Sequence, residues 1–175
     1  MGCRGRTGPA AAITLPVCLL AVSGIASGSA FADPRIRVID HGLYEVKRSG
    51  KAVPARRTLT GKVNVVRTMR LTRRAGKVIA QLGTNFGLRI DLLGFPPGVV
   101  TLTIRARHPK VTNPETGVTR SVSEYDWRVT GRRNLYFGYG IRKRWHINEG
   151  IWTVQILYRG KVLAQQRFEL VVPLN

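Results

Sequence analysis

The sequence predicts an all-β protein, folded as one two-sheet sandwich after an N-terminal export signal. Three observations lead to this prediction. Apolar and polar residues alternate with period two in many short stretches, which is the pattern of half-buried strands. Residues that favour turns, mainly Gly, Pro and Asn, separate these stretches. Apolar residues at positions i, i+3, i+4 and i+7 with helix caps do not occur over any useful length, so we expect little helix.

Residues 1–32 have the parts of a secretory signal peptide. A positively charged start precedes a mostly apolar stretch from Ala10 to Ile25, and Ala30-Phe31-Ala32 places small residues where a signal peptidase cleaves. The apolar stretch is shorter than the about 20 residues that a membrane-spanning helix needs. We therefore predict cleavage after Ala32, a periplasmic or secreted location, and a single mature domain of residues 33–175.

Both cysteines of the chain, Cys3 and Cys18, lie in this signal segment. The mature domain thus has no cysteine and depends on its apolar core, which a domain of this length can build without disulfides. A lipoprotein signal, with the acyl group on Cys18, is the alternative interpretation of the segment. It fits less well, because a small residue is expected directly before the modified cysteine, and Val17 stands there.

Five stretches upstream of the C-terminal part show the period-two alternation: Ile36 to Val46, Val63 to Leu71, Phe86 to Leu92, Val100 to Ala106 and Tyr125 to Val129. The second stretch changes phase near Val66-Arg67, and the extra residue of a β-bulge would absorb that change. The segment from Lys47 to Thr60 is polar and basic and contains Pro54, so we predict that it is a long loop.

The C-terminal part predicts a β-hairpin. Arg159-Gly160-Lys161 forms a short turn with its glycine where a hairpin needs a positive φ. One face of the hairpin is apolar on both strands: Trp152, Val154, Ile156, Tyr158, Phe168, Leu170 and Val172. In total, seven to eight mostly antiparallel strands at this spacing predict an immunoglobulin-like two-sheet sandwich. Sheet packing should bury this hairpin face against Phe86, Leu88, Leu102 and Ile104.

Charge is the most unusual feature of the composition. The chain has 29 basic and 9 acidic residues, and removing Arg4 and Arg6 with the signal leaves 27 basic residues and a net charge of +18. A field of this size attracts polyanions. The expected partner is therefore an anionic polymer, such as an acidic polysaccharide or lipopolysaccharide, or another envelope protein. If the cations cover all faces evenly, they serve solubility and recruit nothing specific.

Six basic residues are the candidates for anion binding: Arg105, Arg107, Arg128, Arg142, Lys143 and Arg144. The first two lie on the outward face of one predicted strand, and Arg128 lies on a neighbouring strand. The last three follow Tyr136 and Tyr139 and precede Trp145, and cations interleaved with aromatic rings can hold a polyanion or a sugar by charge and stacking. The alternative is that the aromatic side chains are core and the cations are only solvated.

Catalytic, metal and cofactor sites are not predicted. The histidines His41, His108 and His146 lack the spacing of metal ligands, and no Gly-x-Ser-x-Gly motif occurs. Glu124 and Asp126 share one strand face about 7 Å apart, which would suit the two carboxylates of a polysaccharide hydrolase. This hydrolase is the alternative function; the simpler interpretation is that both carboxylates are solvated and pair with neighbouring arginines.

A series of short motifs follows one order along the mature chain: Tyr44-Glu45, Gln81 to Gly87, Arg107-His108-Pro109, Thr112 to Gly117, and Gly150 to Gln155 with Leu163-Ala164. In this combination the chain resembles a family of small exported bacterial β-sandwich proteins classed as a domain of unknown function. The resemblance implies an immunoglobulin-like sandwich in the envelope or outside the cell, and it implies no activity or functional residue. The leading hypothesis is a non-enzymatic exported envelope module that binds an anionic partner or an envelope protein.

Overall fold

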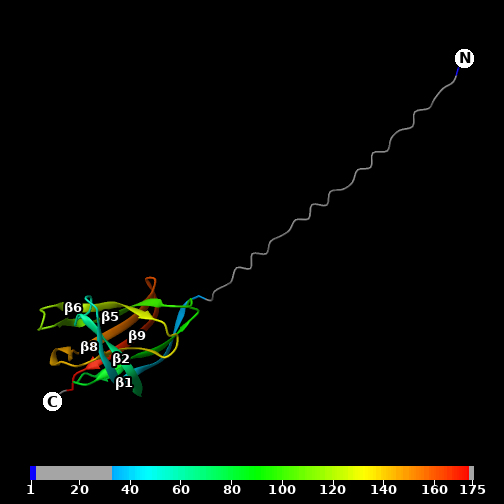
Figure 1. Ribbon diagram of the computed structural model, residues 1–175. Helices are drawn as coiled ribbons and strands as arrows, with labels where there is room; N and C mark the ends of the chain where they lie inside the picture. The colour runs from blue at the N-terminus through cyan, green and yellow to red at the C-terminus, as the bar shows by residue number, and fades with distance from the viewer. Residues whose placement is uncertain (3–32, 174–175) are drawn as a thin grey trace. The chain divides into compact units, whose positions relative to one another are not determined.

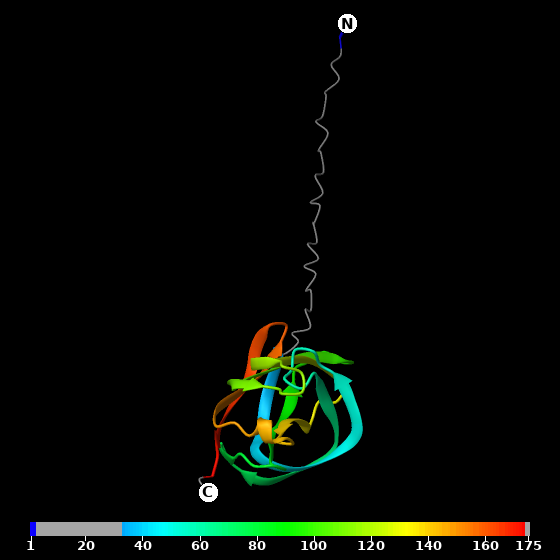
Figure 2. The same cartoon turned by 90° about the vertical axis from the view of Figure 1, so that its left-hand side faces the viewer.

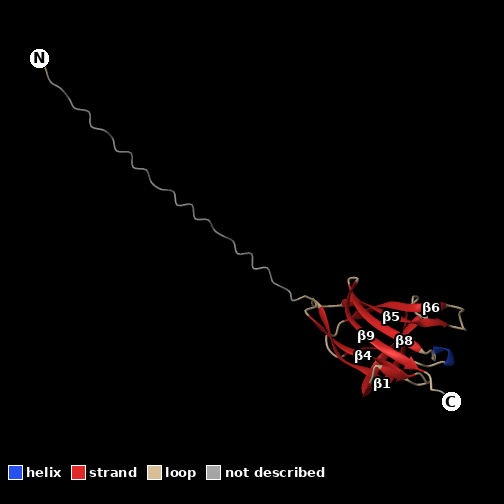
Figure 3. Cartoon of the chain, turned by 180° about the vertical axis from the view of Figure 1, so that it is seen from behind, coloured by secondary structure: helices blue, strands red, loops and turns tan. Residues whose placement is uncertain are grey.

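The computed structural model describes residues 1–2 and 33–173, so the predicted signal peptide and the cysteines lie outside the described residues. From Asp33 onward, strands dominate the chain (Figure 1). The described part contains one short 3₁₀ helix, η1 (Arg144–His146), which lies at one end of the sandwich (Figure 3). No helix in the described part of the chain is long and apolar enough to cross a membrane.

The nine strands of the described residues are β1 (Arg35–Pro54), β2 (Lys62–Arg74), β3 (Lys77–Ile79), β4 (Asn85–Leu93), β5 (Val100–Thr112), β6 (Thr119–Val129), β7 (Leu135–Gly140), β8 (Gly150–Tyr158) and β9 (Lys161–Val171). A four-stranded sheet has the order β2-β1-β4-β7, and a five-stranded sheet has the order β3-β9-β8-β5-β6. All neighbouring strands are antiparallel except β3 and β9. Two strands are absent from the stretches of predicted alternation: β3, which has only three residues, and β7, in which glycines interrupt the apolar pattern.

The inner faces of the two sheets form one apolar core, as the alternation predicted. Its fully buried side chains come from both sheets: Leu88, Ile90, Leu102, Ile104, Ile156, Phe168 and Leu170. Three large rings join the sheets, since the ring centroid of Phe86 lies 5.7 Å from that of Trp152 and 5.1 Å from that of Phe168. The predicted phase of the C-terminal hairpin is therefore confirmed up to Leu170. Val172 departs from it, because β9 ends at Val171 and the Val172 side chain is exposed.

The β8–β9 hairpin has the predicted two-residue turn. Tyr158 pairs with Lys161, and Arg159 and Gly160 have φ angles of 49° and 80°. Two successive positive φ angles are the mark of a type I′ turn, whose twist matches that of the flanking strands.

The prediction of a loop from Lys47 to Thr60 was wrong. Strand β1 continues to Pro54 and pairs with β2, so most of this polar segment is strand. Its alternation is weak because solvent reaches both of its faces near the tip, where residues 49–54 are exposed. The predicted bulge is confirmed: Lys47 pairs with Thr68 and Arg48 with Val66, which leaves Arg67 without an opposite residue.

The β1–β2 hairpin arches across to the five-stranded sheet and is fastened there by its tip. Figure 2 shows it as the cyan-to-green ribbon at the side of the sandwich. At the tip, the N–H of Glu124 donates to the carbonyl oxygen of Arg57 (3.0 Å), and the N–H of Leu59 donates to Oγ of Ser123 (3.3 Å). The side-chain amide of Asn113 also donates to the carbonyl oxygen of Leu59 (3.2 Å).

A buried ion pair fixes the base of the same hairpin. Asp40 is almost fully buried and accepts hydrogen bonds from Nε of Arg89 (3.1 Å) and from the hydroxyl of Tyr44. Burial raises the pKa of the Asp40 carboxyl, but the bonds from Arg89 and Tyr44 outweigh this effect and hold the pKa below its usual value. Tyr44 in turn packs its ring 4.7 Å from that of Tyr136.

Candidate functional site

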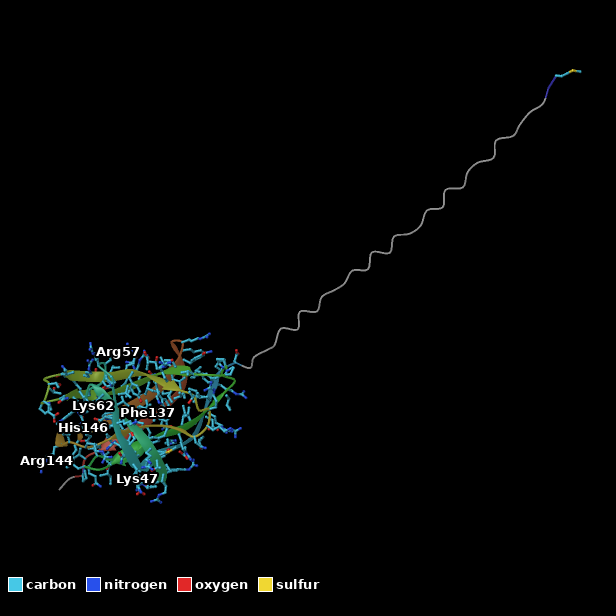
Figure 4. The ribbon with its side chains drawn as sticks, in the orientation of Figure 1. Lys47, Arg57, Lys62, Phe137, Arg144 and His146 are labelled. Carbon is cyan, nitrogen blue, oxygen red and sulfur yellow. The ribbon has the colours of Figure 1, made fainter. Side chains whose placement is uncertain are left out.

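A cleft of about 340 Å³ lies between the arching hairpin and the two sheets. Its walls come from the β1–β2 hairpin, the inner faces of β5 and β6, strand β7, and the segment that contains η1. Figure 4 labels three residues that line it, Lys62, Phe137 and His146, close together toward one end of the sandwich. The cleft exists because the hairpin crosses to the other sheet instead of continuing the four-stranded sheet in one plane.

Aromatic side chains form much of the cleft wall. Tyr139 is central: its ring centroid lies 4.6 Å from that of Trp152 and 5.5 Å from that of His146. Trp145 meets His146 edge-on at 4.0 Å, and the ring of Phe137 faces the same space. Strand β7 places the rings of Phe137 and Tyr139 on one face. On its other face Gly138 leaves room for the Tyr136 ring, since a β-carbon at Gly138 would lie 1.9 Å from the Tyr136 hydroxyl.

Four polar atoms of this wall are buried and have no hydrogen-bond partner among the described residues: Oη of Tyr139 and the ring nitrogens Nε1 of Trp145, Nε2 of His146 and Nε1 of Trp152. Buried polar groups in folded proteins are almost always paired. Each unpaired group costs about 1–3 kcal/mol of stability. Four of them on the wall of one cleft are therefore a functional signal.

The ring of His146, which lines the cleft, keeps a buried donor without a partner among the described residues. The backbone N–H of Arg142 donates to Nδ1 (3.3 Å), which leaves the proton of a neutral ring on Nε2. Burial lowers the pKa of His146, so the neutral ring predominates at pH 7. Nδ1 also lies 3.4 Å from the carbonyl oxygen of Gly140, to which it can donate once the ring is protonated. With the two indole N–H groups, the wall has three nitrogen donors and the Tyr139 hydroxyl.

The rim of the cleft carries four basic residues and one acidic residue. Arg48 and Lys62 come from the hairpin, and Arg142 and Lys143 follow β7. Lys143 is paired with the carboxylate of Glu115.

Sequence analysis did not identify Arg48 and Lys62 as site residues. Arg48 belongs to the polar segment from Lys47 to Thr60, and Lys62 begins the strand after it. The detectable signal was the alternation of aromatic residues and glycines from Phe137 to Gly140, which leaves room on one strand face for side chains from other segments.

The six predicted anion-binding residues are divided between two places. Arg105, Arg107 and Arg128 lie on the outer face of the five-stranded sheet, where Arg105 pairs with Glu124 (Nε–Oε2 2.6 Å). Arg142 and Lys143 line the cleft on the inner side, and Arg144 is exposed in η1 without lining it. The structure therefore brings Arg142 and Lys143 to the candidate site and leaves the other four outside it.

The two carboxylates of the hydrolase hypothesis lie on the outer face of β6 and do not line the cleft. Glu124 is held by Arg105 and by Nη1 of Arg57 (3.2 Å), which agrees with the simpler interpretation of arginine pairing. Asp126 accepts a hydrogen bond from Oγ1 of Thr103 (2.9 Å). Within residues 33–173, no three His, Cys, Asp or Glu side chains gather as metal ligands would.

One contact that sequence analysis missed joins His108 to Ser123. Nε2 of His108 lies 3.2 Å from Oγ of Ser123, and Nδ1 lies 2.8 Å from the carbonyl oxygen of Pro109. This order resembles the base and hydroxyl of an acyl-transfer enzyme. The Ser123 oxygen is, however, already used by the N–H of Leu59 at the hairpin tip, so the pair acts as a fastening for the hairpin.

Comparison with known proteins places the chain in a family. The model of a domain of unknown function, DUF3859, matches residues 32–170. The chain belongs to this family. The crystal structure of an immunoglobulin-like protein from Pseudomonas aeruginosa is similar over 81% of this chain and 99% of that chain, with a TM-score of 0.59 and 23% identity. This likeness confirms the immunoglobulin-like sandwich.

A second structure is a Pseudomonas fluorescens alkylpurine DNA glycosylase bound to DNA that contains an abasic-site analogue. It matches 54% of this chain and 27% of that chain, with a TM-score of 0.34 and 19% identity, which is too low to inform the fold or the function. No curated protein sequence matches the chain.

Proposed function

We propose that this protein is a non-enzymatic binding module of the bacterial envelope and holds its ligand in the cleft between the sheets. The observation that carries the proposal is the set of four buried polar atoms without partners on the aromatic wall. A ligand with hydrogen-bond acceptors that reaches these groups would pair them and remove the cost in stability of leaving them unpaired.

The wall also limits the chemistry of the ligand. An acyl chain has no acceptor along its CH₂ groups and would leave the three N–H donors unpaired, which costs about 1–3 kcal/mol for each donor. A ligand with a flat apolar face and several oxygen acceptors meets both the rings and the donors. The basic rim adds attraction for an anionic partner.

The test uses the three tryptophans of the chain. Trp145 and Trp152 line the cleft, whereas Trp127 is half-buried on β6 outside it. In NMR titrations with neutral and acidic oligosaccharides, we expect the indole N–H signals of Trp145 and Trp152 to move and that of Trp127 to stay. Trp145→Phe keeps a ring face and removes the donor, so it should weaken binding by about tenfold, while Trp127→Phe should not change it. Equal shifts at all three indoles would contradict a cleft site.

Export is the second part of the proposal, and the predicted signal in residues 1–32 supports it. Expression of the full chain in a Gram-negative host followed by fractionation should place the mature protein in the periplasm or the medium. Its N-terminal sequence should begin at Asp33. A mature protein that retains residues 1–32 in the cytoplasm would contradict this part, and a lipid on Cys18 would instead support the lipoprotein alternative.

The alternative function, a polysaccharide hydrolase that uses Glu124 and Asp126, requires both carboxylates in one cleft. Their position on the outer face of β6 favours binding without hydrolysis. Release of reducing ends from envelope polysaccharide, lost in Glu124→Gln, would support the hydrolase. The binding module predicts no release by either form.

A further inference from the structure

Two arginines from distant parts of the chain converge at the mouth of the cleft. Arg48 comes from strand β1, and Arg142 follows strand β7; both line the cleft. They meet over Gly140, where an added β-carbon would lie 2.6 Å from Nη2 of Arg48 and 3.2 Å from Nε of Arg142. A side chain at position 140 would therefore require the two guanidinium groups to move aside.

The half-buried Arg48 and the exposed Arg142 lack the carboxylate partners that two other arginines of the protein have. Neither forms an ion pair with a carboxylate within residues 33–173, and the neutral side-chain oxygen of Asn85 accepts from Nη2 of Arg142 at 2.7 Å. By contrast, the partly buried Arg89 and Arg105 are each bound to a carboxylate. Burial and the positive charge of Arg142 lower the pKa of Arg48. Two adjacent guanidinium groups without a carboxylate partner create a positive potential at the mouth of the cleft that favours a bound anion.

We infer that Arg48 and Arg142 form an anion subsite at the mouth of the cleft, and that the ligand is an acidic sugar whose carboxylate or phosphate binds there. This inference rests on the proposed function, because the sugar ring occupies the cleft itself. Arginine matches both groups, since its planar fork of N–H donors can bind two oxygens at once. The ring and its hydroxyl oxygens then reach the aromatic wall and its unpaired donors.

The size of the cleft sets the length of the bound unit. Its volume of about 340 Å³ is at the lower end of the range of about 300–1,000 Å³ that small-molecule sites cover. The hairpin tip closes one side through its bonds to β6. A monosaccharide or disaccharide unit, such as the end or a side group of a longer polymer, fits this space better than a continuous polymer strand does.

The experiment compares three sugars that share a ring and differ in charge: glucose, glucuronate and glucose 6-phosphate. The intact mature protein is titrated with each, and the indole N–H signals of Trp145 and Trp152 report binding. Both acidic sugars should bind at least about tenfold more tightly than glucose, because each forms charge-assisted hydrogen bonds that glucose lacks. The two acidic arms distinguish a carboxylate preference from a phosphate preference.

A pair of double variants with equal charge separates the subsite from diffuse attraction. R48Q/R142Q removes both guanidinium groups and should reduce the affinity for the acidic sugars to the level of glucose. K47Q/R144Q removes the same charge one residue before Arg48 and two after Arg142, at exposed positions that do not line the cleft (Figure 4). This control should keep the acidic preference. Thermal unfolding of both variants confirms that each is folded.

The possible outcomes test the anion subsite and the proposed binding function of the cleft separately. If glucose and the acidic sugars move the two indoles equally, the anion subsite is wrong and the binding cleft stands. If both double variants lose the acidic preference equally, net charge causes the preference and the subsite is wrong. If no sugar moves the indoles of Trp145 and Trp152, both the inference and the proposed cleft function are wrong.

Discussion

The space between the two sheets has a packed half and a hollow half. In the packed half, side chains such as Leu88, Leu102, Phe168 and Leu170 are fully buried in contact with one another. In the hollow half, the sheets and the β1–β2 hairpin enclose a cleft of about 340 Å³ whose wall keeps four polar atoms without partners among the described residues. The same sandwich therefore contains a tightly packed core and a region beside it that is not filled by side chains.

The difference indicates where selection for stability gave way to another demand. Protein interiors normally reach the density of organic crystals, and voids and unpaired donors both lower stability. Here the hollow half is held open by polar contacts at both ends of the hairpin, the Asp40–Arg89 pair at its base and the Ser123–Leu59 hydrogen bond at its tip. Local departures from good packing concentrate at functional sites, which agrees with a binding role for the cleft.

The largest expected effect comes from the residue at the border of the two halves. Trp152 packs against Phe86 on the dry side and stacks on His108, 4.6 Å away, beside the cleft. Trp152→Ala should lower the free energy of unfolding by about 3–5 kcal/mol, the range for truncation of a buried large aromatic side chain. Urea denaturation measures this change. Trp145→Ala is the comparison in the hollow half, where the half-buried ring should cost clearly less; equal costs would remove the distinction between the halves.

The packed half could be predicted from the sequence because its order is local. Each strand there alternates apolar and polar residues, as from Phe86 to Leu92, and that alternation fixes which face is buried. The bulge at Arg67 was also visible, since one extra residue shifts the phase of the alternation. Gly160 identified the turn of the last hairpin, because glycine readily takes the positive φ that such a turn requires.

The hollow half could not be predicted because it is assembled from segments that sequence spacing does not relate. Arg48, Gly140 and Trp152 line one cleft although more than ninety positions separate Arg48 from Gly140. The segment from Lys47 to Thr60 in the hairpin that encloses the cleft looked like a loop, because residues 49–54 are exposed on both faces and show no alternation. The six cations chosen from charge, strand face and neighbouring aromatic residues do not form one patch: three lie on the outer face of the five-stranded sheet, two line the cleft and Arg144 is exposed in η1.

A second prediction applies one substitution to both halves. Ala80 lies in the packed core, and Ala106 lines the cleft on the inner face of β5; both are buried. Ala80→Leu should destabilise the protein by about 1–3 kcal/mol through overpacking. Ala106→Leu places the same extra volume in free space, so stability should stay within about 1 kcal/mol or rise, while sugar binding is lost. Thermal unfolding and the sugar titrations measure the two effects. A similar loss of stability from both variants would mean that the cleft is not available space.

A third prediction tests whether Ser123 fastens the hairpin. Ser123→Ala removes the acceptor for the N–H of Leu59 and the partner of His108, which should cost about 1–2 kcal/mol. The same change should speed amide exchange at Leu59, because its N–H becomes free to open to water. Ser121→Ala, at an exposed position of the same strand, is the control and should change neither quantity. If Ser123→Ala instead abolishes hydrolysis of an ester substrate with no change in exchange at Leu59, the Ser–His pair is catalytic.

The smallest expected effect is the pH dependence of stability, which also originates beside the cleft. Burial lowers the pKa of both His108 and His146 from the ordinary value of 6.5. For His146, the charge of Lys143 acts in the same direction, whereas the hydrogen bond to Gly140 and the charge of Glu115 oppose it. The unfolded chain therefore binds protons to these two rings at a higher pH than the folded chain does.

It follows that both histidines support the fold fully above pH 6.5 and lose this support as the pH falls through their folded pKa values. The urea midpoint should thus decrease between about pH 6.5 and 5, before the paired carboxylates Asp40 and Asp91, whose folded pKa values lie below 3.8, begin to protonate. In the double variant H108Q/H146Q, which is less stable at pH 7, the decrease of the urea midpoint between pH 6.5 and 5 should largely disappear. The variant His41→Gln, away from the cleft, should keep the wild-type pH dependence. A midpoint that is constant from pH 6.5 to 5 in the wild type would mean that protons reach both rings in the folded state as easily as in the unfolded chain, which would contradict their burial.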